Sequence, residues 1–371
     1  YYRCKKPGFP KRERILLKVA HLAMSKKAKL LKYVFWIFGI LLVIAGGFGY
    51  WLYDWIYKPN VPEQLASEIL YIPTGSNYDD VKERLTEGGF LKKDNSFDWV
   101  AKKMNYPGQI KAGRYHILPS WSNYHLIRHL RQGIQEPVKL TFNSVRTIAE
   151  LSEKLAEQLE PNEKQFQEFL TRPGVLDSIG YSKETLMTIF IPNTYEVYWN
   201  VTPVQLLQRM IREHDSFWDK AGRKEKAEAQ SLSPTEVYTL ASIVEKESLR
   251  EDEKPRIAGV YLNRLHQGMK LDADPTVVFA VGDFTLRRIL NKHLAVDSPY
   301  NTYKYAGLPP GPICMPSISS LDAVLNAERH EYLFFCAKMD GTGSHAFAKT
   351  ITAHLVNARR LHQYLNERGI Q

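Results

Sequence analysis

The chain has 371 residues, of which 44% are hydrophobic and 24% charged, and this composition excludes a disordered protein and a single small domain. Its formal net charge of +10 is local: residues 1–33 carry eleven Lys and Arg residues and one acid, so the remainder is neutral overall. A nucleic-acid-binding protein needs its positive field on the folded domain, so we expect no nucleic-acid partner. Three cysteines are too few for a disulfide scaffold.

Residues 33–53 form an apolar run without a charge. As a helix, a run of this length spans the hydrocarbon core of a bilayer, which is about 30 Å thick. Tyr and Trp residues gather at both of its ends, as they do at membrane interfaces. The basic residues precede the run, which predicts a cytoplasmic N-terminus. We therefore expect a basic cytoplasmic tail over 1–32 and a single-pass anchor over 33–56, with everything after Tyr57 outside the cytoplasm.

A cleaved signal peptide is the alternative to an anchor, but its apolar core is shorter, about 7–15 residues. The chain begins with Tyr, and Met24 opens a compact basic leader of its own, so we expect residues 1–23 to lie upstream of the true start. Outside the cytoplasm, Cys314 and Cys336 are either disulfide-bonded or two buried thiols, and the sequence favours neither.

A near-repeat marks the first region after the anchor. The segment 73–78 (PTGSNY) returns as 119–124 (PSWSNY), each time after a strand-like run and before a short helical pattern. Ser and Asn residues stand at the expected N-caps, and glycines follow both helices. This pattern predicts a small domain of strands and short helices over 57–139.

The region 140–371 contains no low-complexity stretch and has mostly helical periodicity, so the fold class is α+β. A strand-like run at 138–142 stands at the domain boundary, before the first expected helix. Later strand-like runs are few, and the clearest are 332–337 and 345–347, which flank a turn-like Asp340-Gly-Thr-Gly segment. The expected helices are 147–159, 162–170, 203–218, 234–249, 253–267, 319–327 and 351–367.

One carboxylate stands out on the expected helix 234–249. Ser233 and Glu236 form a capping box, and Leu240, Ile243 and Val244 form the apolar stripe. The next position of that stripe is Glu247, whereas Glu245 projects from a different face. A carboxyl on a buried face keeps its proton more readily and suits a general acid, unless it emerges at the helix end into water.

Several other patterns are too weak to indicate chemistry. Asp272-x-Asp274 is a single acidic pair, and His345 and His354 lack zinc-ligand spacing, so we expect neither a metal nor a cofactor. Polar loops at 191–195, 272–276, 298–303 and 307–312 are rich in Tyr, Asn and Thr, which suit sugar hydroxyls and turns equally well.

Taken in order, these segments resemble the YceG-like endolytic murein transglycosylases, membrane-anchored enzymes of bacterial cell-wall assembly. The resemblance covers nearly all of 60–371, with departures at Asn193, Ala273 and 314–317. It rests on the anchor and on FIPNTYEVY (190–198), LASIVEKES (240–248), VYLNRL (260–265), GMKLDADPT (268–276), SPYNTYKYAGLPPGPI (298–313) and GSHAF (343–347) with His354.

The resemblance implies an α+β protein with a transmembrane helix, a small LysM-like domain over 57–139 and a mixed α/β catalytic domain over 140–371. It implies that Glu247, the second Glu of Glu-Lys-Glu, is the catalytic acid. It implies peptidoglycan glycan strands as substrate, the bacterial inner membrane as location and cell-wall synthases as candidate partners. Together with residue type, it places these substrate-binding residues along the groove: Glu245, Asn193, Thr194, Tyr195, Asp274, Thr276, Asn301, Tyr303, His345 and Phe347.

Ordinary glycosidases need two carboxylates that flank the bond, which Glu245 and Glu247 on one helix cannot do. A lytic transglycosylase instead uses the C6 hydroxyl of the muramic acid ring as nucleophile, and forms a 1,6-anhydro end. The resulting hypothesis is an endo-acting terminase of nascent strands with Glu247 as acid and base. Two alternatives stay open, namely a hydrolytic muramidase at the same site and a non-enzymatic, membrane-tethered glycan-binding protein.

Overall fold

The computed structural model describes residues 11–286, 288–338 and 342–367. The first part of the expected basic tail (residues 1–10) and the first half of the turn expected at 340–343 (residues 340 and 341) lie outside the described residues. The chain divides into two compact units, unit 1 (Tyr1–Gln135) and unit 2 (Glu136–Gln371). Helices and small antiparallel sheets make up both units, which confirms the α+β class.

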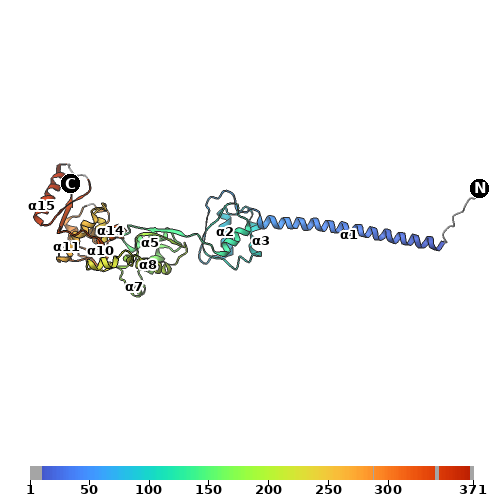
Figure 1. Ribbon diagram of the computed structural model, residues 1–371, viewed down its shortest axis with the longest axis horizontal. Helices are drawn as coiled ribbons and strands as arrows, with labels where there is room; N and C mark the ends of the chain where they lie inside the picture. Colours follow the sequence, from blue (N-terminus) through green and yellow to red (C-terminus); the bar gives the residue numbers. More distant parts are fainter. Residues whose placement is uncertain (1–10, 287, 339–341, 368–371) are drawn as a thin grey trace, which may run out of the picture. The chain divides into compact units, whose positions relative to one another are not determined.

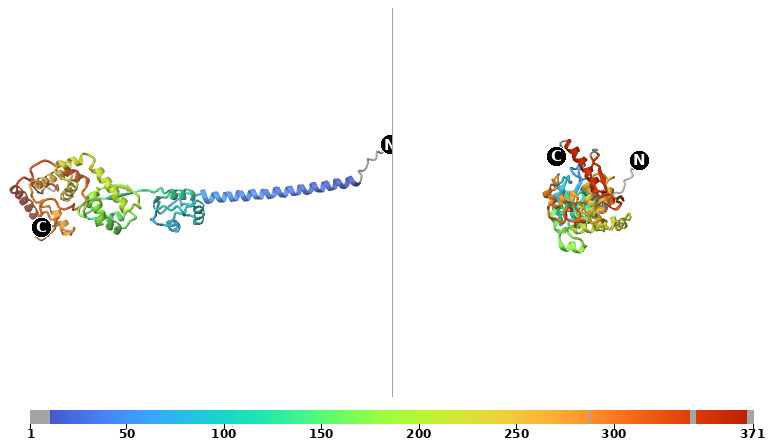
Figure 2. Two further views of the ribbon diagram at one scale, coloured as in Figure 1. Left: turned by 90° about the horizontal axis from the view of Figure 1, so that it is seen from below. Right: turned by 90° about the vertical axis from the view of Figure 1, so that its left-hand side faces the viewer.

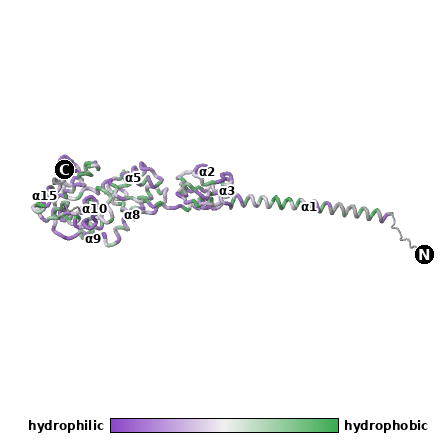
Figure 3. Tube along the Cα trace, turned by 90° about the horizontal axis from the view of Figure 1, so that it is seen from above, coloured by the Kyte–Doolittle hydropathy of each residue, from purple (hydrophilic) through white to green (hydrophobic). Residues whose placement is uncertain are grey.

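Unit 1 begins with one long helix, α1 (Lys11–Tyr57), which runs as a continuous rod through its basic and apolar parts (Figures 1 and 2). Residues Lys29–Tyr57 form a helical segment long and apolar enough to cross a membrane (Figure 3). None of its most apolar window is buried in the protein. This segment contains the apolar run that the sequence singles out as an anchor.

The folded part of unit 1 consists of a two-stranded sheet and three helices. Its elements are β1 (Ile69–Ile72), α2 (Tyr78–Glu87), α3 (Asp94–Lys103), β2 (Gly113–His116) and α4 (Asn123–Gln132). The strands that precede the two copies of the near-repeat, β1 and β2, pair antiparallel, with Ile72 opposite Gly113. Asn77 and Ser122 cap α2 and α4 as the sequence predicts. Helix α3 has no counterpart among the predicted elements.

Unit 2 opens with strand β3 (Val138–Phe142), which pairs antiparallel with β4 (Asn193–Val197). The pairing places residues 138 and 139 in unit 2. Between and after these strands lie α5 (Ile148–Ala156), α6 (Glu163–Leu170), α7 (Pro173–Ile179), the short 3₁₀ helix η1 (Leu186–Ile189), α8 (Pro203–Trp218) and α9 (Arg223–Ala229).

The second half of unit 2 is built around α10 (Pro234–Glu247), whose residues 237–244 are all buried. It packs against α11 (Lys254–His266), α12 (Asp274–Val281) and α14 (Ile318–Leu325). The remaining elements are α13 (Asn291–Leu294), β5 (Phe334–Ala337), β6 (His345–Ala348) and α15 (Ile351–Glu367), and β5 pairs antiparallel with β6. All seven predicted helices of this region are present, whereas α7, α9, α12 and α13 were not predicted.

The capping box of α10 forms as predicted. The Ser233 hydroxyl accepts a hydrogen bond from the Glu236 N–H, and the Glu236 carboxylate accepts one from the Ser233 N–H. Capping fixes where the helix begins, and its fourteen residues then end at Glu247. Cys314 and Cys336 are free thiols, and Cys314 is buried beside the backbone of α10.

Candidate active site

Glu247 is the last residue of α10 and lies where two pockets meet. The first pocket has a volume of about 500 Å³ and is lined by α12 and by Phe284, Leu286, Arg288 and Ile289. The second, of about 420 Å³, is bounded by α11, the β5–β6 hairpin and α15. Glu247 and Asp274 line both pockets, so these two carboxyl groups stand at the junction of one groove that continues in two directions.

The Glu247 carboxyl is held by a neighbour from the next helix. The phenol of Tyr261 on α11 donates a hydrogen bond of 2.6 Å to Glu247 Oε1. Burial raises the pKa of Glu247 to about 7, and the negative charge of Asp274 acts in the same direction. The Tyr261 hydrogen bond and the positive charge of Arg264 oppose this shift only in part. The C-terminal end of a helix also disfavours a negative charge. Glu247 therefore keeps its proton in weak acid and loses it only as the pH rises through about 7.

Asp274 is fixed by a second phenol. Asp274 is the first residue of α12, and the Tyr303 hydroxyl donates a hydrogen bond of 2.6 Å to its Oδ1. Burial and the Asp274 charge raise the pKa of Tyr303 well above its ordinary value, so this donor stays protonated. Arg264 also lines the second pocket, and its guanidinium donates hydrogen bonds to the carbonyls of Leu271 and Leu333.

His345 lies on strand β6, lines the second pocket and is hydrogen-bonded to a buried carboxylate. Glu253 is 6% exposed and accepts hydrogen bonds from the His345 backbone N–H (3.0 Å) and from its Nδ1 (2.8 Å). Because Nδ1 is engaged, Nε2 is the imidazole atom left for a ligand in the pocket. The sequence did not identify Glu253, Tyr261 or Arg264, although Tyr261 and Arg264 lie inside the quoted segment 260–265.

Cationic side chains line the first pocket and the hollow beyond it. Arg146, Lys246 and Arg288 border the first pocket, and Arg146 and Phe279 also border a third hollow of about 490 Å³ over α5, α6 and η1. The Arg146 guanidinium lies 4.7 Å from the centre of the Phe284 ring. The groove thus extends from the hairpin, past Glu247, to the surface of α5.

Comparisons with known proteins show the family of the chain. The model of the YceG-like family matches residues 70–360. The chain belongs to the YceG-like family. It is 29% identical over 335 residues to a Bacillus subtilis protein named endolytic murein transglycosylase. The aligned region covers 84% of this chain and 89% of the Bacillus protein. A Streptococcus pneumoniae protein of the same name is 27% identical over 333 residues, and this chain spans 60% of its length.

A solved structure shares the fold of this YceG-like protein. The crystal structure of a YceG-like protein from Listeria monocytogenes superposes with a TM-score of 0.52 at 28% sequence identity. The superposition covers 78% of this chain and 97% of the Listeria chain.

Four of the predicted site residues gather in the groove of this YceG-like protein. Glu247, Asp274, Tyr303 and His345 all line the second pocket. Phe347 lies on β6 beside His345, but its ring packs against Tyr332 and Phe335.

Three predicted substrate ligands are buried and already hydrogen-bonded within the protein. The Asn301 amide donates to the carbonyls of Leu294 and Val296, and the Thr276 hydroxyl donates to the Ala273 carbonyl. The Tyr195 hydroxyl donates to the Ile191 carbonyl. Direct contact of these side chains with a glycan does not fit the structure, because their polar atoms hold the loops that frame the groove.

Asn193 and Thr194 are exposed but lie at another hollow. They line a depression of about 370 Å³ together with 141–144 and the start of α14, and none of its lining residues borders the two pockets at Glu247. On this geometry they do not belong to the groove at Glu247.

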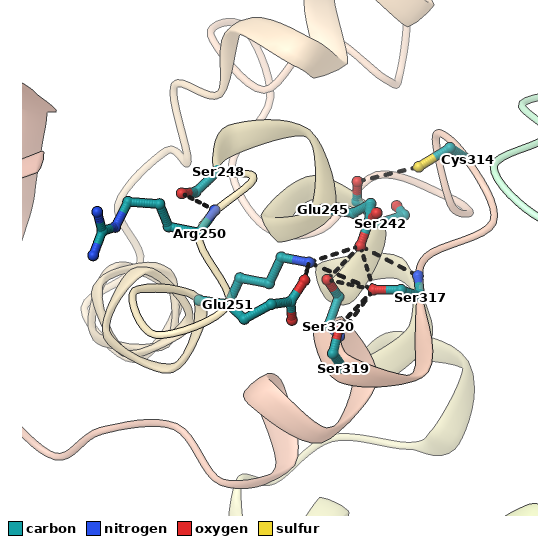
Figure 4. Close-up of polar contacts among 10 residues, drawn as sticks. Ser242, Glu245, Ser248, Arg250, Glu251, Cys314, Ser317, Ser319 and Ser320 are labelled. Carbon is teal, nitrogen blue, oxygen red and sulfur yellow. Dashed lines mark hydrogen bonds and ion pairs between the residues drawn. The ribbon is translucent and has the colours of Figure 1, made fainter. Parts of the chain in front are cut away.

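Glu245 lines neither pocket at Glu247 and points instead toward Ser317 and Ser320 at the start of α14 (Figure 4). Its Oε2 accepts hydrogen bonds from the hydroxyls of Ser317 (2.6 Å) and Ser320 (2.5 Å) and lies 3.2 Å from Lys254 Nζ. Although burial opposes it, these hydrogen bonds and the Lys254 charge lower the pKa of Glu245. Glu245 is thus an ionised carboxylate that ties α10 to α14 and α11, and substrate contact, as predicted for it, does not fit this position.

Proposed function

We propose that this chain is an endolytic murein transglycosylase that cleaves the MurNAc–GlcNAc bond of peptidoglycan strands and leaves a 1,6-anhydro-MurNAc end. One observation carries the proposal: Glu247, a carboxyl whose pKa burial raises to about 7, stands where two pockets of similar size meet. A strand that occupies both pockets presents an internal bond to Glu247, as endolytic cleavage requires. The names of the bacterial relatives support the same activity.

In the proposed reaction Glu247 donates its proton to the glycosidic oxygen, and the bond from that oxygen to C1 breaks. Positive charge develops at C1, where the Asp274 carboxylate at the same junction stabilises it. The C6 hydroxyl of the same ring then closes on C1 and gives its proton to the Glu247 carboxylate. No water is consumed, and Glu247 regains its proton. Intramolecular attack supplies the proximity that a second, nucleophilic carboxylate would otherwise provide.

The remaining groove residues act as supports in this proposal. Tyr261 orients the acid, and Tyr303 holds Asp274. His345 presents Nε2 to the sugar or its N-acetyl group in the second pocket. The cations that border the first pocket suit the carboxylates of peptide stems.

The helix that is long and apolar enough to cross a membrane supports a location of this reaction at the cell surface. We infer that the basic N-terminal residues stay in the cytoplasm and that both folded units lie outside it, at the bacterial inner membrane. Nascent glycan strands are made at that surface, so an anchored enzyme would set their length as a terminase. The folded part of unit 1 is proposed as a LysM-like glycan-binding domain, and cell-wall synthases as partners.

Product masses from un-crosslinked glycan strands test the proposal. The full chain in detergent should produce fragments that end in anhydro-MurNAc, and the Glu247→Gln variant should produce none. Fragments heavier by one water would identify a hydrolytic muramidase. Strand binding without any product from the wild type would identify a glycan-binding protein.

A further inference from the structure

A cluster of three tryptophans joins the membrane helix to the folded part of unit 1. The Trp99 ring on α3 lies with its centre 5.6 Å from that of Trp51 and 5.8 Å from that of Trp55, both in edge-on contacts. Trp51 and Trp55 lie on successive turns of α1, and their ring centres are 4.3 Å apart. Helix α3 is therefore packed directly on the last turns of α1.

Buried asparagines make this junction rigid. The Asn123 amide on α4 donates to the Trp55 carbonyl (2.8 Å) and to the Ser96 hydroxyl (3.0 Å). The Asn60 amide donates to Asn123 Oδ1 (2.7 Å), and Asn60 Oδ1 accepts from the Lys93 backbone N–H (2.9 Å). Because Asn60 is 4% exposed and Asn123 is 1% exposed, breaking these bonds would leave buried polar groups without partners. The ends of α1 and α3 thus move as one body.

The junction fixes the depth of Trp99. The uncharged run of α1 ends at Tyr53, so Trp51 lies about 3 Å inside the end of the apolar span and Trp55 about 3 Å beyond it. Trp99 contacts both rings and must lie at the same level. That level is the boundary between acyl chains and headgroups, where the amphipathic indole is most stable.

Ammonium groups surround this level. Lys58 Nζ lies 2.8 Å from the Tyr50 hydroxyl and 2.7 Å from Asp54, and Lys93 Nζ lies 3.6 Å from the same Asp54. Lys103, one turn after Trp99, places its Nζ 5.7 Å from the centre of that ring. One carboxylate, Asp54, thus faces two of these lysines.

We propose that α3 is a membrane-interface element whose Trp99 inserts at the level of the lipid headgroups and whose Lys93 and Lys103 bind the phosphates of anionic phospholipids. Continuity with the membrane helix argues for lipid as the occupant, since a surface fixed to α1 at this depth meets the bilayer before any soluble partner. The folded part of unit 1 is then held against the membrane surface and does not move freely relative to α1.

Quenching of tryptophan emission by brominated lipid tests the depth of Trp99. The full chain is reconstituted into vesicles of phosphatidylglycerol and phosphatidylethanolamine, with bromine near the headgroup end of the acyl chains. The difference in emission between the wild type and the Trp99→Phe variant isolates Trp99. We expect its quenching to equal that of Trp51, isolated in the same way by Trp51→Phe. Trp218, which is 1% exposed in unit 2, is the control and should show no quenching.

Two results would overturn the insertion of Trp99. If dissolved acrylamide quenches Trp99 and brominated lipid does not, α3 stands in water. If neither quencher reaches Trp99, a second copy of this chain covers it in place of lipid. Since both outcomes concern unit 1 alone, they are independent of the glycan-cleaving activity.

The lysines are tested by brominating only the phosphatidylglycerol in the same mixture. Quenching of Trp99 should exceed that obtained when only the phosphatidylethanolamine is brominated, and the Lys93→Gln/Lys103→Gln variant should lose this preference. The matched control is Lys82→Gln/Lys102→Gln, because these lysines pair with Asp98, which binds Tyr78 of α2. Equal quenching by both lipids in the wild type would refute the phosphate contacts.

Discussion

The phenol of Tyr261 donates a hydrogen bond of 2.6 Å to Oε1 of Glu247, from the second turn of α11 to the last residue of α10. Burial raises the pKa of Tyr261 well above its ordinary value, so it remains a donor throughout the working pH range. This contact stabilises the ionised form of Glu247, whereas burial stabilises the protonated form more strongly. The balance between the two leaves an acid whose pKa is close to neutral pH.

The first prediction concerns the pH profile. Because the donor form of Glu247 exists below its pKa, strand cleavage should be constant in weak acid and fall as the pH rises through about 7. The Tyr261→Phe variant loses the hydrogen bond that lowers the pKa of Glu247, so its cleavage rate should fall at a higher pH than that of the wild type. The maximal rate should drop about tenfold, because the carboxyl is less well oriented. Initial rates of anhydro-end formation across pH 5 to 9, about two units either side of the midpoint, measure both effects. A fall at unchanged pH in the variant would contradict this role of Tyr261.

The second prediction concerns Glu247→Gln. Loss of the acid should lower the rate of strand cleavage by about 10²-fold to 10⁴-fold. The pKa of Glu247 is raised from 4.5 to about 7 in the folded protein, so the folded state binds the proton more tightly than the unfolded state does. Stability is therefore full below about 4.5 and is lost as the pH rises through 7. The variant lacks this loss and should be more stable than the wild type at pH 8, by on the order of 1–3 kcal/mol. Urea unfolding at pH 5 and 8 measures the difference, and equal stability at pH 8 would count against a buried acid.

The sequence singles out Glu247 as a candidate acid because a helical stripe is a local pattern, and the cap at Ser233 fixes the phase of that stripe. Tyr261 and Glu253 escaped notice because their partners lie 14 and 92 residues away, and no local spacing encodes such contacts. Asn301 has the residue type of a sugar ligand. Only the folded loop shows that its amide already donates hydrogen bonds to two backbone carbonyls.

The third prediction separates Glu245 from catalysis. The Lys254 side chain is 3% exposed and depends on Glu245 and Glu251 for its counter-charge. Glu245→Gln leaves that ammonium underpaired and should cost about 3 kcal/mol of stability. The double variant Glu245→Gln/Lys254→Met should recover most of this loss, because no buried charge then remains. Chemical unfolding measures the stabilities, and the pH dependence of cleavage should match the wild type in both variants. A displaced pH profile would show that Glu245 acts on the acid itself.

The fourth prediction contrasts Asn301 with Tyr303. Asn301→Ala leaves the Leu294 and Val296 carbonyls without their donor and should destabilise unit 2 by about 1–3 kcal/mol. Tyr303→Phe keeps the ring and removes the donor to Asp274, so its effect should fall on kcat with little change in unfolding. Thermal unfolding and steady-state kinetics on both variants test the contrast. Full stability of Asn301→Ala, together with a raised KM, would return Asn301 to the substrate site.

The fifth prediction concerns Glu253, which acts through His345. Both carboxylate oxygens of Glu253 hold His345, one at its backbone N–H and one at Nδ1, so the proton of the neutral imidazole is kept on Nδ1. In Glu253→Gln the amide can meet Nδ1 with its NH₂ group, which favours the proton on Nε2 instead. We expect the ¹⁵N shifts of the His345 ring to exchange their pattern and kcat to fall about tenfold, the scale of one lost charged hydrogen bond. His345→Gln is the matched control, since it should lower kcat without adding to the effect of Glu253→Gln in the double variant. Additive losses would mean that Glu253 supports the groove by some route other than His345.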